Sequence, residues 1–197
     1  QPRPQSQPPW LALHDLEKDY DVRQLSADLE AVDPAIETLV LIHPKELSDR
    51  AWFAVDQFVL RGGRLLAFVD PLCLADAMNQ DQPAMMGMPN VSSDLGPLTA
   101  AWGLTYDRGR VVADIAASTR VRRGDRTIED NPVFLSLQAV NINGADLLTA
   151  SLESLGMPTA GAIGGTGVEG LQVGSLLVSS EQSSLVGDMT AQMGAEA

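Results

Sequence analysis

Residues 37–70 read ETLVLIHPKELSDRAWFAVDQFVLRGGRLLAFVD, and this stretch decides the predicted fold. Residues 38–42 and 65–69 are apolar runs that do not alternate with polar residues, which is typical of strands buried on both faces of a parallel sheet. Between them, Ser48 is a suitable N-cap for a helix whose apolar residues recur at helical spacing as far as Gly62. The stretch therefore predicts a strand, a helix and a second strand parallel to the first.

The flanking residues carry further helix and strand signals. Apolar residues recur at helical spacing in four more segments: residues 10–20, 72–79, 95–102 and 143–155. Strands are predicted at residues 110–113 and 134–140, a β-hairpin at residues 119–126, and short antiparallel or edge strands after residue 160. Residues 80–93 show no periodicity, and we expect a loop there.

These signals predict a single α/β domain over residues 10–188, built as a sandwich with a mostly parallel central sheet and a β-rich C-terminal extension. The β-hairpin is expected to be an insertion at residues 118–140. Residues 1–9, QPRPQSQPP, predict a linker or loop, which suggests that the natural gene product extends further upstream. Residues 189–197 are expected to form a fraying tail.

Composition excludes several classes of protein. The formal net charge of −13 and the pI near 4.3 argue against nucleic-acid binding, because phosphate contacts require clustered Lys and Arg. The same charge would be repelled by an anionic membrane surface. No apolar run approaches the roughly 18 residues that suggest a membrane span. Cys73 is the only cysteine, which excludes an intrachain disulfide.

The first candidate site lies where the two apolar runs end. His43 and Lys45 follow the first run and Asp70 follows the second, and carboxyl ends of neighbouring parallel strands meet at one edge of a sheet, where ligands bind. These residues are therefore candidates for ligand binding. The alternative is that the His-Pro and Asp-Pro pairs only begin loops. His14 lies on a predicted helix without metal-ligand spacing, so we predict no metal site and no cofactor.

Two other patterns favour structural interpretations. Cys73 lies three residues after Asp70, but no glycine-flanked turn exposes it and no base adjoins it in sequence, so an inert buried thiol is the simpler interpretation. Residues 161–170, GAIGGTGVEG, lack the Lys-Ser or Lys-Thr pair of a phosphate loop and predict a turn between short strands.

The chain has one local concentration of basic residues. Arg120, Arg122 and Arg123 lie on the predicted β-hairpin of an otherwise acidic chain. They are candidates for a docking surface that attracts an acidic partner. The alternative is a solvated hairpin edge whose charges prevent aggregation.

The chain also resembles a known family. Residues 43–49 (HPKELSD) and 54–71 (AVDQFVLRGGRLLAFVDP) resemble the auxiliary, substrate-binding-like proteins of ABC-type transport systems associated with gliding motility. Further similar stretches are residues 10–25, 95–114, 147–163 and 176–183, so the resemblance spans most of the chain. It implies a three-layer α/β sandwich like that of flavodoxin or the class I glutamine amidotransferases.

The resemblance also implies a setting. Family members are similar in being periplasmic, extracytoplasmic domains that are anchored by transmembrane helices absent from this chain and that work beside an ABC-2 type permease and an ATPase. We therefore expect a non-catalytic binding or scaffolding component that recognises a substrate or a partner subunit, as a possible oligomer. The alternatives are a hydrolase or amidotransferase-like enzyme that uses His43, Asp70 or Cys73, and a purely structural spacer.

Overall fold

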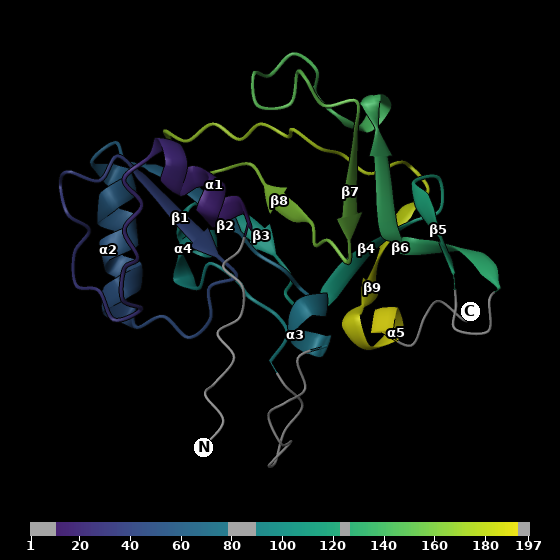
Figure 1. The fold of residues 1–197 in the computed structure, drawn as a ribbon, viewed down its shortest axis with the longest axis horizontal. Helices are drawn as coiled ribbons and strands as arrows, with labels where there is room; N and C mark the ends of the chain where they lie inside the picture. The colour runs from purple at the N-terminus through teal and green to yellow at the C-terminus, as the bar shows by residue number, and fades with distance from the viewer. Residues whose placement is uncertain (1–10, 79–89, 123–126, 193–197) are drawn as a thin grey trace, which may run out of the picture.

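The computed structural model describes residues 11–78, 90–122 and 127–192. Its helices are α1 (Leu11–Asp19), α2 (Asp49–Leu60), α3 (Leu74–Met78), α4 (Pro97–Ala101) and α5 (Asp188–Gln192), with a 3-10 turn η1 (Ala139–Asn141). Its strands are β1 (Thr38–Ile42), β2 (Arg64–Phe68), β3 (Leu104–Tyr106), β4 (Arg110–Asp114), β5 (Ser118–Arg122), β6 (Ile128–Gln138), β7 (Ser154–Pro158), β8 (Ile163–Gly165) and β9 (Ser183–Gly187). Along the long axis of the molecule, α2, β1 and β2 lie at one end and β5, β6 and β7 at the other (Figure 1).

The strand–helix–strand prediction is confirmed. β1 and β2 are parallel neighbours, and α2 connects them. The Ser48 hydroxyl accepts a hydrogen bond of 3.2 Å from the Ala51 amide, which is the predicted N-cap. At the other end, Gly62 has a φ of +92°, a left-handed conformation that glycine adopts without strain and that returns the chain to the sheet.

The first hydrophobic core lies between α2 and one face of this strand pair. Trp52, Val55 and Phe58 are buried on α2 and pack with Leu39 of β1. Gly63 allows the tight return of the chain, because a Cβ atom at this position would lie 2.4 Å from the Phe58 ring. Residues at helical spacing therefore form one wall of the core, as predicted.

The prediction that both strands are buried on both faces is wrong. Only one face of the pair is covered by α2, while Val40, Ile42, Leu66 and Phe68 on the other face are exposed. Their sequence pattern is that of a two-sided core, but the described residues supply only one side.

The predicted sandwich with a mostly parallel central sheet, flavodoxin-like or amidotransferase-like, is also wrong. Beyond β2 the chain forms small antiparallel sheets: β3 with β8, β4 with β9, and β5 with β6 and β7. A parallel neighbour requires a crossover of about a dozen residues or more, usually a helix. The helices that follow β2, α3 and α4, have only five residues each, and the strands after them pair with later strands in antiparallel registers instead of joining the parallel pair.

The hairpin segment forms the antiparallel pair that its alternating residues predicted. β5 pairs with β6, and β6 continues into contact with β7. The expected turn at Gly124–Asp125 lies outside the described residues, as does Arg123. Leu135 and Leu137 of β6 pack with Val112 of β4 in a second core that is separate from the first.

Two C-terminal predictions are corrected. The helix predicted at residues 143–155 does not form: residues 143–153 form turns and irregular structure, and residues 154–155 begin β7. The side chains of Asn143 and Asp146 accept hydrogen bonds from the amides of Ala145 and Leu148 instead. Such local bonds compete with helical ones. Residues 163–165 form β8 instead of a turn. A Cβ atom at Gly165 would lie 2.4 Å from the Gly103 carbonyl oxygen, so the glycine permits close approach of the two backbones.

Candidate functional site

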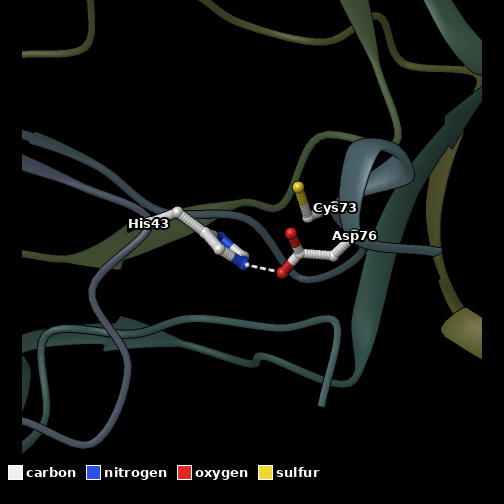
Figure 2. Close-up of side chains that lie close together, drawn as sticks. All are labelled: His43, Cys73 and Asp76. Carbon is white, nitrogen blue, oxygen red and sulfur yellow. Dashed lines mark hydrogen bonds and ion pairs between the residues drawn. The ribbon is translucent and has the colours of Figure 1, made fainter. Parts of the chain in front are cut away.

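The most concentrated polar chemistry in the described residues lies where β1 and β2 end. His43 follows β1 directly, and its amide donates a hydrogen bond of 2.9 Å to the Phe68 carbonyl at the end of β2. Its φ of +48° lies in the left-handed region, which is uncommon for a residue other than glycine. The backbone thus fixes His43 at the sheet edge, and the imidazole Nε2 lies 3.1 Å from Asp76 Oδ2 (Figure 2).

Asp76 on α3 joins this end of the sheet to the short helix. Lys45 donates hydrogen bonds to Asp76 Oδ2 and to the Asn90 carbonyl oxygen. The hydrogen bond from Lys45 holds the pKa of Asp76 below its ordinary value, with a smaller contribution from His43 and against the effect of partial burial. Asp76 is therefore ionised at neutral pH and faces both basic groups.

Cys73 completes the cluster. One ligand atom each from His43, Cys73 and Asp76 lies within 4.8 Å of the other two, and all three residues are half-buried. Cys73 precedes α3, and its amide donates a hydrogen bond of 2.8 Å to Val91. Figure 2 shows the three side chains gathered in one place, His43 from the end of β1 and the other two from the start of α3. We call His43, Cys73 and Asp76 the strand-end cluster.

Asp70 borders the strand-end cluster, where the sequence placed it. Its amide donates a hydrogen bond to Ser93 Oγ, and its carbonyl accepts one from the Ser93 amide at 2.7 Å. Burial raises the pKa of Asp70, the His43 charge opposes that rise and the nearby Asp76 adds to it. The structure therefore brings His43, Lys45 and Asp70 to one sheet edge.

Two buried polar atoms near this edge are without hydrogen-bond partners among the described residues. They are the Nδ1 of His43 and the phenol oxygen of Tyr106. Burial, and then the negative charge of Asp70, raise the pKa of Tyr106, so the phenol stays neutral at physiological pH. Buried polar groups are rarely left unpaired, and each of these atoms therefore marks a place where a further partner would fit.

The geometry does not favour the enzyme alternative. An activated cysteine needs a base within hydrogen-bond reach, and no hydrogen bond joins Cys73 to His43 in the described residues. The best-formed depressions on the described surface are open and lie elsewhere, around Phe53 and around Arg61. The described residues thus show neither a hydrogen bond that would activate the Cys73 thiol nor one of these two depressions at the strand-end cluster.

Sequence reasoning missed Asp76 and Tyr106. The available signal for Asp76 was its spacing of three residues from Cys73 in a predicted helix directly after a strand end, which places both side chains on one helix face. No signal pointed to Tyr106.

Of the predicted docking residues, Arg120 and Arg122 are exposed on β5, and the Arg120 Nε lies 3.4 Å from Asp130. Their proposed role stays a prediction.

None of the helices in the described ranges is long and apolar enough to cross a lipid bilayer. No curated protein and no solved structure matches the chain. A family model described as an ABC-type uncharacterized transport system matches residues 1–196, which is nearly the whole sequence. The chain therefore belongs to this family and is an auxiliary component of an ABC-type transport system.

Proposed function

We propose that this chain is a non-catalytic docking domain that binds a membrane-embedded subunit of its transport system through the exposed face of the β1–β2 pair. Four large apolar side chains make up this face, which we call the apolar sheet face: Val40, Ile42, Leu66 and Phe68. Its exposure in strands whose sequence is that of a buried sheet is the observation that carries the proposal.

The register makes the patch continuous. Val40 lies directly opposite Leu66, and Ile42 lies directly opposite Phe68, so the four side chains form a two-by-two block on one face. About half of Leu66 (50%) and Phe68 (54%) is exposed, and rather less of Val40 and Ile42. The opposite face is already covered by α2, so a partner has only this side of the pair left to cover.

Docking explains the surface better than small-substrate binding does. A specific small-molecule site is normally concave and encloses most of its ligand. The best-formed depressions among the described residues are open, and they lie away from both the apolar sheet face and His43. An apolar block outside these depressions suits a protein subunit instead.

The finer setting follows the family resemblance. We infer that the partner is an ABC-2 type permease with its ATPase, that the domain lies on the extracytoplasmic face of the membrane, and that the system serves gliding motility. Membership in a family of ABC-type transport components supports a membrane-bound partner. Cysteine-accessibility labelling of Cys73 in intact cells, with and without permeabilisation of the inner membrane, tests the location.

The docking test replaces Leu66 and Phe68 together by Thr, which preserves strand propensity and removes the apolar bulk. About half of each side chain is available for burial by the partner. The double variant should therefore lose about 2 kcal/mol of binding free energy, which is roughly a thirtyfold rise in Kd. The measurement is co-purification with detergent-solubilised membrane subunits, followed by surface binding. Phe53→Gln is the matched control, because Phe53 is 62% exposed but lies on α2.

The expected result is weakened association for the double variant, wild-type association for Phe53→Gln, and a folded protein in both cases. Equal association of wild type and double variant would overturn the proposal. Loss of self-association alone, seen by analytical ultracentrifugation, would also overturn it, because the occupant would then be a second copy of the chain.

A further inference from the structure

We propose that the strand-end cluster of His43, Cys73 and Asp76 is a binding site for a divalent transition-metal cation, with Zn²⁺ as the best fit. The three ligand atoms already lie within 4.8 Å of one another without any cation between them. In a tetrahedral zinc site they would be about 3.5 Å apart, given Zn–S near 2.3 Å and Zn–N near 2.1 Å. Closing the cluster therefore needs side-chain movements of about 1 Å.

His43 presents its ring nitrogen Nε2 to the rest of the strand-end cluster. Nε2 lies 3.1 Å from Oδ2 of Asp76, close to the spacing of about 3.5 Å between two ligands of one tetrahedral zinc ion. A cation bound here would replace the proton that the imidazole and the carboxylate share, and Nε2 would be the ligand atom of His43. Nδ1, on the other side of the ring, would then carry the remaining proton; it is buried and has no partner among the described residues.

Asp76 has an oxygen available as well. The hydrogen bonds from His43 and Lys45 both end on Oδ2. This arrangement leaves Oδ1 for a cation, because no hydrogen bond within the described part of the chain engages it. The carboxylate would thus keep Lys45 on one oxygen and ligate the cation with the other.

The mixture of donors selects the kind of cation. A thiolate and an imidazole suit zinc and similar transition metals, whereas Mg²⁺ and Ca²⁺ require sets of oxygen ligands. Three protein ligands fill three tetrahedral positions, and the fourth stays open to water or to a ligand from a partner. The site is independent of the apolar sheet face, so either proposal can fail without the other.

Lys45 distinguishes this proposal from a purely structural ion-pair cluster. Its ammonium group binds Asp76 and places a positive charge beside the cation position. Removing the charge by Lys45→Met strengthens the binding of a divalent cation by about tenfold, from the Coulomb energy of charges several ångströms apart. If Asp76 only tethers α3 to the end of β1, the same substitution removes part of the tether and creates no zinc affinity.

The test uses the reduced chain with a phosphine reductant. Zn²⁺ binding is measured by titration calorimetry, and Co²⁺ is used as a spectroscopic probe whose thiolate charge-transfer absorption reports direct ligation by Cys73. Cys73→Ser and His43→Gln each remove one ligand. His14→Gln is the matched control, because His14 is the other histidine and lies exposed on α1. Far-ultraviolet circular dichroism verifies that each variant is folded.

We expect one Zn²⁺ per chain, a cobalt charge-transfer band that Cys73→Ser abolishes, and at least tenfold weaker binding in Cys73→Ser and His43→Gln. Lys45→Met should bind more tightly, His14→Gln should match wild type, and excess Mg²⁺ should not compete. Binding that persists unchanged in folded Cys73→Ser would overturn the proposal, because it would come from exposed carboxylates. The absence of a cobalt–thiolate band in wild type would overturn it as well.

Discussion

Asp114 at the end of β4 is the residue whose substitution should most damage the antiparallel part of the fold. Its side chain is buried, with 0% exposed. Its Oδ1 accepts hydrogen bonds from the amides of Ala116 and Ala117 and from the Ser180 hydroxyl, and its Oδ2 accepts one of 2.6 Å from the Ser180 amide. One carboxylate thus holds the turn after β4 against the loop before β9.

The cost of removing this carboxylate follows from its contacts. A hydrogen bond to a charged group contributes about 1.5–3 kcal/mol, and a buried donor left without an acceptor costs about 1–3 kcal/mol. Part of the loss at the Ala116 amide, at an exposed residue, is recovered by water. Asp114→Ala should therefore lower the free energy of unfolding by about 3–5 kcal/mol, a large fraction of the 5–15 kcal/mol typical of a domain. The free energy of unfolding of Asp114→Asn should lie between those of the wild type and Asp114→Ala.

The measurement is urea unfolding followed by circular dichroism, with Asp107→Ala as the control. Asp107 also accepts an amide hydrogen bond, from Gly109 at 3.0 Å, but in an exposed turn. The control should lose less than about 1 kcal/mol. If both variants lost the same free energy, burial of the Asp114 network would not be the source of its contribution.

The pH dependence of stability gives a second readout of Asp114. Burial raises the pKa of Asp114, but the hydrogen bonds from Ser180, Ala117 and Ala116 together outweigh burial and lower it below the ordinary value. A lowered pKa in the folded state stabilises the fold above the unfolded pKa of about 3.9, and the contribution is lost as pH falls through the folded pKa. Asp114→Asn should lack this part of the acid destabilisation. An equally steep loss below pH 4 in the variant would contradict the assignment.

Local signals in residues 37–70 were sufficient to predict the strand–helix–strand unit. The cap at Ser48, the apolar spacing of α2 and the glycine stop at Gly62 all act between residues a few positions apart. The neighbouring parallel strand then follows, because a single helix joins the two runs. The resulting core needs only contacts that the pattern itself specifies.

The antiparallel sheets depend on contacts that no local pattern encodes. β4 pairs with β9, so Val112 lies opposite Leu185, and the two strands could equally have joined the parallel sheet by their composition. The helix predicted at residues 143–155 does not form because of a local effect, not a long-range one. The side chains of Asn143 and Asp146 accept hydrogen bonds from nearby amides, and these bonds outweigh the helical spacing of the apolar residues. Leu147 is consequently 96% exposed instead of forming a helix face.

The candidate site was predictable where it depends on topology. The pattern of two neighbouring parallel strands predicts that His43, Lys45 and Asp70 lie at one edge of the sheet, and they do. Asp76 was missed because its hydrogen-bond partners precede it by 31 and 33 residues, and only the folded position of α3 brings them together. Long-range contacts of side chains were thus the part that sequence patterns did not contain.

Two further predictions test a helix face and a charged surface. Val55→Asp should lower the free energy of unfolding by roughly 4 kcal/mol or more, because Val55 is fully buried under the sheet and the charge would have no partner. Leu60→Asp, on the exposed side of α2, should lower it by less than about 1 kcal/mol in the same urea assay. Replacing Arg120 and Arg122 by Gln should leave stability unchanged, because exposed ion pairs such as Arg120 with Asp130 contribute about 0–1 kcal/mol. If these residues attract an acidic surface of a membrane subunit, the double variant should associate more slowly and with weaker salt dependence. Arg50→Gln, which removes an exposed ion pair between Arg50 of α2 and Glu30, should leave both unchanged. Stopped-flow or surface-binding rates at two salt concentrations measure this, and rates that are indifferent to both the substitution and the salt would leave β5 as a solvated sheet edge.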